Sequence, residues 1–337
     1  MLKAGKRFAA NVSVFPFVTV IEGRKLKVAG IGSVATDPDF RGKGYASRLM
    51  KHLDGRLREE GYDLSILWGF RFYRSFGYEM AVPREKFYFS NRHLKPLPVQ
   101  GKIRAAVPGD WNTMRWMFLK HPYHNERVLK YYGSLERRYQ KDTQDPFWVL
   151  EKAGRVAAYA VFGRSWGGDW EVMEWGGEPE GAAALIQNAL VRGIAKGLTL
   201  AAHEGGGLYP WAQENCDSWE QGTDGCMVKI FNLASVLKAF EPQLKRRYEE
   251  SPFKSRKSFT LRLPDGQEAG IALNGGVRVL PKGSKTGALM ELNPLKCVRF
   301  LLGRGKASEA AGLKGPEARV LDALFPLKWF WWKSDYI

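Results

Sequence analysis

The sequence predicts an α+β (α/β layered) fold made of three successive units, and three observations support this prediction. Residues 28–68 alternate β-prone runs with one amphipathic helix. Residues 147–202 repeat that order, with a hairpin, a strand, a helix and a strand. The last third combines helical segments with a further hairpin. We therefore expect domains at residues 1–98, 99–229 and 230–337.

The first unit opens with two strands that lead into a helix. Val12 to Ile21 and Val28 to Thr36 are β-prone runs separated by a Glu22-Gly23 turn. Apolar residues at helical spacing then predict one buried helix face, made by Ala46, Leu49, Met50, Leu53 and Leu57. The apolar run Leu64 to Trp68 predicts the next strand. A short helix and a last strand precede a Pro-containing boundary at residues 94–98.

The other two units are expected to mix helices and strands as well. In the middle unit we expect helices at 111–120 and 125–141, strands at 147–151, 156–162 and 170–175, a helix at 181–196 and a strand at 198–202. In the last unit we expect a helix at 233–248, a hairpin of 259–263 and 268–273, a helix at 292–302 and a very aromatic end at 321–337.

The composition is that of an ordinary globular protein, with 45% hydrophobic and 26% charged residues. Three cysteines without metal or redox spacing favour a reducing cytoplasm. The five histidines show no ligand spacing, so we expect no metal. No run of 18 apolar residues exists, and we therefore expect no membrane partner.

The net charge of +17 is unevenly distributed along the sequence. Residues 96–229 are nearly neutral, with 15 basic and 16 acidic residues. Residues 1–95 contain 18 Lys and Arg against 9 Asp and Glu, and residues 230–337 contain 19 against 10. Such an excess attracts an anionic cofactor, a nucleic acid or an anionic membrane. The densest clusters, at residues 245–247 and 254–257, are typical of solvated faces, so nucleic acid is an unlikely partner.

The glycine-rich turn before the first predicted helix is the most informative segment. Arg41 and Lys43 stand where the helix begins, although the positive end of a helix dipole disfavours cations. A bound anion, held by these cations and by the free backbone N–H groups, would explain them. Gly42 and Gly44 lack a Cβ atom, so a phosphate could lie against the backbone. The alternative is a tight βα turn with solvated cations.

The spacing of Arg41, Gly44 and Ala46 limits which phosphate-containing ligand the turn could bind. The P-loop pattern is absent, and Ser47 occupies the third small position of a dinucleotide fingerprint. What remains is Arg41-x-x-Gly44-x-Ala46, which follows the strand end at residues 34–36. This arrangement resembles the acetyl-CoA pyrophosphate loop of the GNAT N-acetyltransferases. The resemblance implies acetyl-CoA as a co-substrate.

The middle unit repeats the order of elements but has a different turn. Gly176-Gly-Glu-Pro-Glu180 places two carboxylates at the helix entrance, where they would repel a pyrophosphate. We interpret residues 99–229 as a second, cryptic GNAT-like domain that cannot bind CoA. Four carboxylates of this unit would suit a polycationic acceptor or would face solvent: Glu171, Glu174, Glu178 and Glu180.

The order of the three units resembles the Eis (enhanced intracellular survival) family of bacterial acetyltransferases. The resemblance is carried by Gly30 to Thr36, Arg41 to Ala46, Phe72 to Tyr78, Leu321 to Pro326 and Asp335 to Ile337. It implies a C-terminal domain similar to sterol carrier proteins, and a homohexamer. It also implies that the opening strand and two helices of the GNAT fold are missing here, because the first strand already corresponds to a later hairpin.

The resemblance assigns roles to individual residues. Val34, Ala35 and Thr36 would hold the pantetheine arm and the thioester carbonyl. The pyrophosphate would be held by Arg41, Gly42, Lys43, Gly44, Tyr45 and Ala46. Tyr73 would be the general acid, and the α-carboxylate of Ile337 would be the base.

The chemistry of amide formation is consistent with these roles. Attack of an amine on a thioester needs a neutral amine, a stabilised oxyanion and a proton for the leaving thiolate. A tyrosine, with a pKa of about 10, can donate that proton, whereas a carboxylate is a weak base for an amine unless it is desolvated. Tyr73 could instead be a core residue, and Tyr78 is its nearest rival.

The aromatic end of the chain, at residues 321–337, leaves two further alternatives. We expect a buried tail, and the alternative is an interfacial membrane anchor. The sequence thus predicts transfer of acetyl from acetyl-CoA to a primary amine of an aminoglycoside-like polyamine or a protein lysine. The alternative is a module that binds nucleic acid or lipid and keeps a vestigial site.

Overall fold

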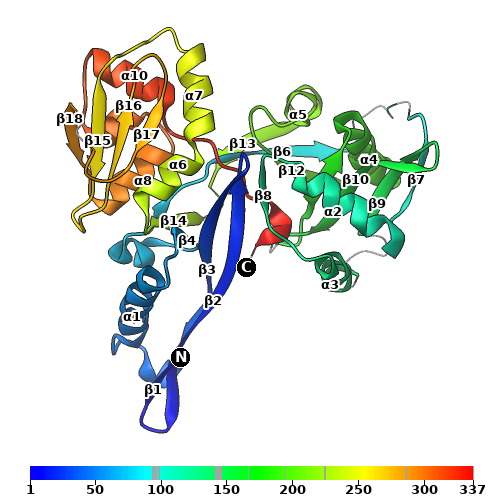
Figure 1. Ribbon diagram of the computed structural model, residues 1–337. Coiled ribbons are helices and arrows are strands. Elements are labelled where there is room, and N and C mark those ends of the chain that lie inside the picture. Colours follow the sequence, from blue (N-terminus) through cyan, green and yellow to red (C-terminus); the bar gives the residue numbers. More distant parts are fainter. Residues whose placement is uncertain are drawn as a thin grey trace. The chain divides into compact units, whose positions relative to one another are not determined.

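The computed structural model describes residues 1–92, 97, 99–140, 146–165, 167–193, 195–223, 225–284 and 287–336. The chain divides into two compact units, and neither is continuous in sequence (Figure 1). Unit 1 contains residues 1–83 and 223–329, and unit 2 contains residues 84–222 and 330–336. Both units combine sheets with helices, which confirms the α+β prediction.

The first sheet of unit 1 has the strand order β1-β2-β3-β4-β14-β5. Its strands are β1 Leu2–Ala4, β2 Arg7–Ile21, β3 Arg24–Thr36, β4 Leu64–Trp68, β5 Glu79–Met80 and β14 Cys226–Ile230. The hairpin of β2 and β3 is antiparallel, β4 is parallel to β3, and β14 is antiparallel to β4. Helix α1 (Tyr45–Glu59) joins β3 to β4, so unit 1 contains the predicted strand-turn-helix-strand order.

Helix α1 buries the face that the apolar spacing predicts. Its buried residues are Leu49, Met50, Leu53 and Leu57, while Ala46 is half-buried. Met50, Leu53 and Leu57 share an apolar cluster with residues of β3 and β4 such as Ile31 and Leu67. Two short 3₁₀ helices, η1 Pro38–Phe40 and η2 Arg71–Phe76, lie at either end of this α1–β4 segment.

The rest of unit 1 contains a second sheet, in the order β17-β16-β15-β18, with five helices. The strands are β15 Ser258–Arg262, β16 Glu268–Ala272, β17 Arg278–Leu280 and β18 Ala288–Glu291. The helices are α6 Leu233–Ala239, α7 Glu241–Glu250, α8 Pro294–Leu302, α9 Ala307–Ala311 and α10 Pro316–Leu324. The single helix expected at 233–248 is interrupted at Phe240, because Pro242 lacks an N–H and lies in the first turn of a new helix. The likeness to sterol carrier proteins stays a prediction.

Unit 2 is built on one sheet with the order β13-β6-β12-β11-β10-β9-β7. Its strands are β6 Arg84–Ser90, β7 Lys102–Ala105, β9 Phe147–Lys152, β10 Arg155–Arg164, β11 Trp170–Gly177, β12 Gly197–Ala202 and β13 Ser218–Gly222, and β8 is Tyr123–Asn125. Its helices are α2 Trp111–Leu119, α3 Lys130–Tyr139, α4 Pro179–Val191 and α5 Tyr209–Asn215, with η3 Pro108–Asp110 and η4 Lys333–Asp335. Helix α3 is shorter than the helix expected at 125–141, whose first residue is in β8.

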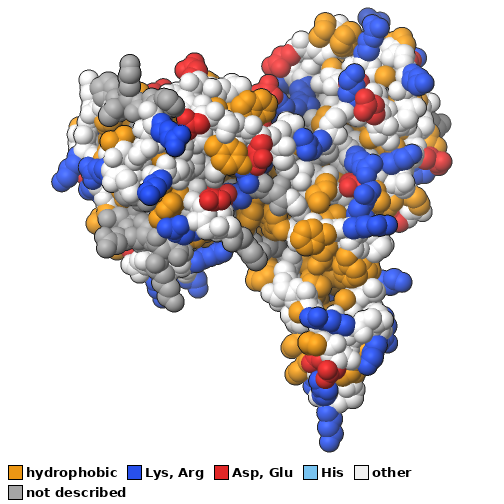
Figure 2. Space-filling view, turned by 180° about the vertical axis from the view of Figure 1, so that it is seen from behind, with side chains coloured by type: hydrophobic (Ala, Val, Ile, Leu, Met, Phe, Trp, Pro, Cys, Tyr) orange, Lys and Arg blue, Asp and Glu red, His pale blue; other side chains and the backbone are white. Residues whose placement is uncertain are grey.

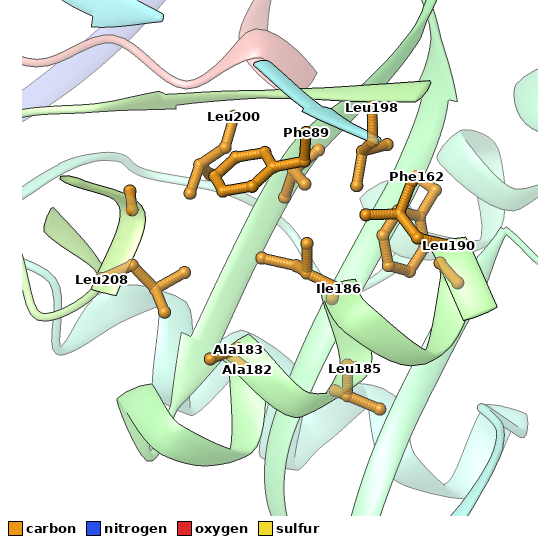
Figure 3. Close-up of a cluster of buried hydrophobic side chains, with 14 of the residues drawn as sticks. Phe89, Phe162, Ala182, Ala183, Leu185, Ile186, Leu190, Leu198, Leu200 and Leu208 are labelled. Atoms are coloured by element: carbon orange, nitrogen blue, oxygen red, sulfur yellow. The ribbon is translucent and has the colours of Figure 1, made fainter. Parts of the chain in front are cut away.

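The core of unit 2 lies between α4 and its sheet. Ile186 and Leu190 of α4 lie on the side of the helix that faces Phe89 and Leu198 of the strands (Figure 3). Strand β11 is antiparallel to β10 and parallel to β12, with α4 between β11 and β12. Unit 2 therefore repeats the hairpin-helix-strand order of unit 1, as the sequence predicts.

The compact units do not follow the expected contiguous boundaries. Strand β6 pairs with β12 and β13 of unit 2, whereas β14 pairs with β4 and β5 of unit 1 (Figure 1). Apolar patterning identifies both segments as strands but does not tell which sheet each one joins. Of the expected boundary at 94–98, only Leu97 is among the described residues. No helix in the described part of the chain is both long and apolar enough to span a bilayer.

Candidate functional site

The entrance of helix α1 is open and carries no side-chain cap. Gly44 is the N-cap residue in a left-handed conformation, with φ of 75°, and no side chain of the described residues caps the first-turn N–H groups. Gly42 also has a positive φ, of 74°. A Cβ atom added at either glycine would meet no atom within 4 Å. This combination leaves first-turn backbone donors accessible to an anion.

The charges around this entrance are arranged to leave a cation exposed. Arg7 forms ion pairs with Asp39 (2.7 Å) and Asp37 (3.4 Å), and Lys43 donates to the backbone oxygen of Asp39 (2.9 Å). Arg41 is exposed and makes no side-chain hydrogen bond or ion pair within the described residues. The two nearby carboxylates are thus paired, while the Arg41 guanidinium is available to a ligand.

Strand β3 extends well past its pairing with β4. The two strands are in register from Val28–Leu64 to Gly30–Ile66, and β3 continues to Thr36. The opposite edge of β3 pairs with β2 as far as Thr36, the last residue of β3. A bulge interrupts this pairing beside Asn11, whose side-chain amide donates to the Ser33 oxygen (3.1 Å). Successive N–H groups of a strand point to opposite sides, so some of the backbone N–H groups of residues 31–36 point away from β2. The end of β3 therefore offers backbone donors to a ligand.

Tyr73 lies in η2 and packs on the core that α1 covers. Its side chain is half-buried and joins Val34 at the edge of the same apolar cluster. A Cβ atom on Gly69 would come within 2.5 Å of the Tyr73 ring, so this glycine makes room for the ring. Partial burial raises the pKa of Tyr73, and the described residues provide its hydroxyl with no hydrogen-bond partner. The hydroxyl therefore stays protonated at neutral pH.

Tyr78 occupies a different environment. It is 2% exposed, and its hydroxyl forms a hydrogen bond of 2.8 Å with that of Ser65 on β4. Burial raises its pKa strongly. The rings of Tyr73 and Tyr78 are 6.3 Å apart, so Tyr78 packs beneath Tyr73. Tyr73 and Tyr78, the two candidates for the general acid, thus differ in their access to solvent.

Lys229 is a structural anchor of this region that the sequence reasoning missed. Its ammonium group pairs with Asp54 of α1 and donates to the backbone oxygen of Phe76 (2.7 Å) at the end of η2. Burial lowers its pKa. The lysine thereby ties β14, α1 and the segment that carries Tyr73 together. A lone lysine within the apolar run of β14 was the available signal.

A cavity of about 330 Å³ lies beside this anchor in unit 1, lined in part by Asp54, Lys229 and Cys297. None of the residues predicted to bind acetyl-CoA or to act in catalysis lines it. Of the predicted site, Val34 at the end of β3 and Tyr73 pack on the apolar cluster that contains Met50 of α1.

The C-terminal tail is held inside unit 2 as far as Tyr336. Arg127 is buried and pairs with Asp335 (2.5 Å) and with Glu174 (2.5 Å), and Asn125 donates to Asp335 (2.8 Å). Ser334 donates to Glu174 (2.7 Å). The tail is therefore buried, as expected. Ile337, the predicted base, lies outside the described residues.

Two of the four carboxylates considered for an acceptor are buried. Glu174 is 0% exposed and accepts hydrogen bonds from Arg127 and Tyr159. Glu171 is also buried and pairs with Lys333 (3.3 Å). The expectation that these two carboxylates face an acceptor or solvent is therefore wrong, because tail and sheet residues enclose them.

The entrance of helix α4 contrasts with that of α1. A Cβ atom on Gly177 would overlap the backbone oxygen of Ala157, and one on Gly181 would come within 2.8 Å of the Ala158 Cβ atom. Glu178 is the N-cap residue and pairs with Lys152. The glycines here allow close packing of protein on protein, and the exposed charge is negative.

The basic clusters of the last third are largely engaged within unit 1. Lys245 pairs with Glu241, Arg246 with Glu22, and Lys257 with Glu317. On the face seen in Figure 2, Lys and Arg side chains are interspersed with acidic and hydrophobic ones. This arrangement is typical of a solvated surface with local ion pairs.

A family model matches the N-terminal part of the chain. Residues 2–81 match the family model described as an acetyltransferase (GNAT) domain. The comparison with curated proteins gives no match. Residues 2–81 therefore form a GNAT acetyltransferase domain, and the chain is an acyltransferase.

Several solved structures are similar in fold. A probable N-acyltransferase from Enterococcus faecalis aligns with a TM-score of 0.70 at 19% identity, covering 95% of this chain and 84% of that one. A GCN5-related N-acetyltransferase from Kribbella flavida aligns with a TM-score of 0.67 at 19% identity, covering 99% and 87%. Eis1 from Mycobacterium abscessus aligns with a TM-score of 0.65 at 13% identity, covering 99% and 90%. The fold of the whole chain is thus similar to that of N-acetyltransferases.

Proposed function

We propose that this protein is an acetyl-CoA-dependent N-acetyltransferase that acetylates a primary amine of an aminoglycoside-like polyamine or a protein lysine. The observation that carries the proposal is the open entrance of α1, where Gly42 and Gly44 leave space and Arg41 is exposed. The pyrophosphate of acetyl-CoA would accept hydrogen bonds from the N–H groups of Tyr45 and Ala46 and would be neutralised by Arg41 and Lys43.

The thioester would lie along the end of β3. Val34, Ala35 and Thr36 lie beyond the last residue pair that β3 forms with β4, so the pantetheine arm could pair with this strand edge. A backbone N–H here would donate to the thioester carbonyl and would stabilise the oxyanion that forms when the amine attacks. The nitrogen–carbon bond forms first, and the carbon–sulfur bond then breaks.

Tyr73 would protonate the leaving thiolate of CoA. Its raised pKa supports this role, because the hydroxyl keeps its proton at neutral pH and becomes a donor only when a strong base appears. Its position beside Val34 on the same apolar cluster also supports it. Tyr78 is a weaker candidate because it is buried and already hydrogen-bonded to Ser65.

The α-carboxylate of Ile337 would be the base that receives the proton of the amine. Support comes from the family resemblance at Asp335 to Ile337, of which the structure describes Asp335, held by Arg127 and Asn125. The family resemblance extends the proposal to a cytoplasmic homohexamer with a sterol-carrier-like domain.

A thiol-release assay with acetyl-CoA and a panel of polyamines and lysine peptides tests the reaction. N-terminally tagged protein should release CoA only when an amine is present. The same protein with a C-terminal His-tag should be inactive, because the Ile337 carboxylate becomes an amide. Ile337→Leu should keep activity, because the terminal carboxylate remains. Equal rates for the N-tagged and C-tagged proteins would contradict the role of Ile337, and amine-independent release would contradict the proposed transfer.

A further inference from the structure

The cavity of about 330 Å³ beside Lys229 is lined by segments that are far apart in sequence. Its walls come from α1, the end of η2, β14, the turn between β15 and β16, and the beginning of α8. All of these segments belong to unit 1. The volume falls within the range of about 300–1,000 Å³ that is usual for small-molecule sites, at its lower end. The cavity can therefore hold a small organic molecule.

Part of the cavity wall is apolar. This part is made by Phe76, Ile230, Leu263, Pro294 and Cys297, and three of them, Ile230, Leu263 and Cys297, are buried. An apolar group that enters such a cavity is removed from water, which stabilises the complex. A well-matched ligand therefore has an apolar body.

The two carboxylates that line the cavity are already paired. Asp54 pairs with Lys229 and with Arg58 (3.4 Å). Asp265 pairs with Arg58 (2.9 Å) and accepts a hydrogen bond from the Gln267 amide (2.9 Å). A cationic ligand would have to displace these partners, so the cavity does not favour a cation.

Two cations of the cavity keep hydrogen-bonding capacity for a ligand. The Lys229 ammonium has three N–H bonds, and the described residues accept two of them, at Asp54 and at the backbone oxygen of Phe76 (2.7 Å). Lys229 is 7% exposed, so water has little access to the third. Lys51 is exposed and makes no side-chain hydrogen bond or ion pair within the described residues. It precedes Asp54 by three residues on the same face of α1, so an anion beside Lys229 would be near both cations.

The charges of the lining indicate the charge of the ligand. Three cations and two carboxylates line the cavity: Lys51, Arg58, Lys229, Asp54 and Asp265. One positive charge is left over, and a monoanion would neutralise it. A dianion such as a phosphate monoester would be repelled more strongly by the two carboxylates. A carboxylate on an apolar body fits both the charge and the walls.

We propose that this cavity binds a small organic monocarboxylate with an apolar body. The carboxylate would accept hydrogen bonds from Lys229 and Lys51, and the apolar body would lie against Ile230 and Leu263. The ligand would thereby contact α1, β14 and the β15–β16 turn at once. The cavity shares no residue with the proposed acetyl-CoA and catalytic site, so this proposal does not rest on the proposed acetyl transfer.

Calorimetric titration of the full, untagged chain with benzoate and with isovalerate tests the site. The wild type should bind one molecule of at least one of these acids per chain. Benzyl alcohol, which has the same apolar body as benzoate but no charge, should bind at least about tenfold more weakly than benzoate. Absence of binding of both acids would overturn the proposal. Tighter binding of phenyl phosphate than of benzoate, or equal binding of benzyl alcohol, would overturn it as well.

A reversal of charge at Lys51 tests the position of the carboxylate. Lys51→Glu should weaken binding of the acid by at least about tenfold, because a like charge replaces a donor, and the exposed position should tolerate the change. Lys296→Glu is the matched control, since it makes the same change at an exposed residue of α8 that does not line the cavity. It should keep the wild-type affinity, as should Arg41→Glu at the α1 entrance. Equal affinities of Lys51→Glu and the wild type would contradict the proposal.

Methyl NMR provides a second measurement, which locates the ligand. Benzoate should shift the methyl signals of Ile230 and Leu263, because its ring would lie against them. The same addition to Lys51→Glu should shift them much less at equal concentration. Binding of benzoate that leaves both methyl signals of the wild type unchanged would place the ligand elsewhere and overturn the proposal.

Discussion

Helices α1 and α4 begin after the same order of elements, yet their entrances differ in charge and in packing. At α1, Gly42 and Gly44 border open space and Arg41 is exposed. At α4, Gly177 and Gly181 lie against the backbone or side chains of β10, and Glu178 is the N-cap residue. The two turns share glycines but use them differently.

This difference shows what a glycine-rich turn needs before it can hold a phosphate. Glycine permits close approach, and the approaching group can be a ligand or another part of the protein. At α4 the protein itself lies against Gly177 and Gly181, so we expect no pyrophosphate to bind there even without the carboxylates. At α1 the space and the positive charge both favour an anion. The comparison favours unit 1 alone as the place where the pyrophosphate would bind.

The largest effect is expected at Tyr73, on which the chemistry of unit 1 depends. Tyr73→Phe should lower kcat about 10²- to 10⁴-fold, because the leaving thiolate loses its proton donor. The KM for acetyl-CoA should change little, since the ring still packs beside Gly69. Steady-state kinetics in the thiol-release assay measure both parameters.

Tyr78→Phe is the matched control for this change. It removes a hydroxyl that is buried and bonded to Ser65, so it should reduce stability by about 1 kcal/mol and leave kcat nearly unchanged. Comparable losses of kcat in both variants would indicate that Tyr73 acts through packing. A larger loss in Tyr78→Phe would transfer the acid role to Tyr78.

The next effect concerns the charge at the two entrances. Removing a charge-assisted hydrogen bond costs about 1.5–3 kcal/mol, and Arg41→Glu also introduces repulsion. We therefore expect acetyl-CoA affinity to fall by more than about tenfold, measured by calorimetry. Glu180→Lys makes the opposite change in the first turn of α4 and should leave affinity unchanged. A second acetyl-CoA site in Glu180→Lys would contradict the conclusion that packing, and not charge alone, distinguishes the two entrances.

Glycine substitutions should separate packing from ligand space. Gly177→Ala should destabilise unit 2 by about 3 kcal/mol or more, because the new Cβ atom would overlap the Ala157 oxygen at a positive φ. Gly42→Ala should cost only the left-handed strain of about 1–2 kcal/mol, because nothing lies nearby. Denaturant unfolding measures both. Equal losses of stability would mean that the α1 entrance is not open.

The smallest expected effect is a shift in pH dependence. Partial burial raises the pKa of Tyr73, and the protonated form is the donor. The fall of kcat on the basic side should therefore occur above the ordinary tyrosine value of about 10. Tyr73→Phe should abolish that fall. A basic limb that persists unchanged in Tyr73→Phe would assign it to another group.

Much of unit 1 could be predicted because its signals are local. The buried stripe of α1, the bounds of β4 and the turn at Gly44 follow from periodicity and from glycine chemistry. The break at Phe240 was also readable, since Pro242 stands in the sequence, but helical spacing on both sides obscured it.

The rest depends on contacts between distant residues. Nothing local indicates that β6 and β14 join different sheets, or that Glu174 is enclosed by Arg127 and the tail. His121 and His203, which are 82 residues apart, become neighbours only through the fold of unit 2. In each case the decisive partner is far away in sequence, so its effect appears only when the chain is folded.

Calorimetric titration of the wild-type chain with acetyl-CoA tests the central claim most directly. The account predicts one molecule bound per chain, because the α1 entrance accepts a pyrophosphate and the α4 entrance does not. It also predicts that Arg41→Glu weakens this binding, while Glu180→Lys does not. Absence of binding, two molecules per chain, or an Arg41→Glu variant that binds as tightly as the wild type would contradict the assignment of the pyrophosphate to α1.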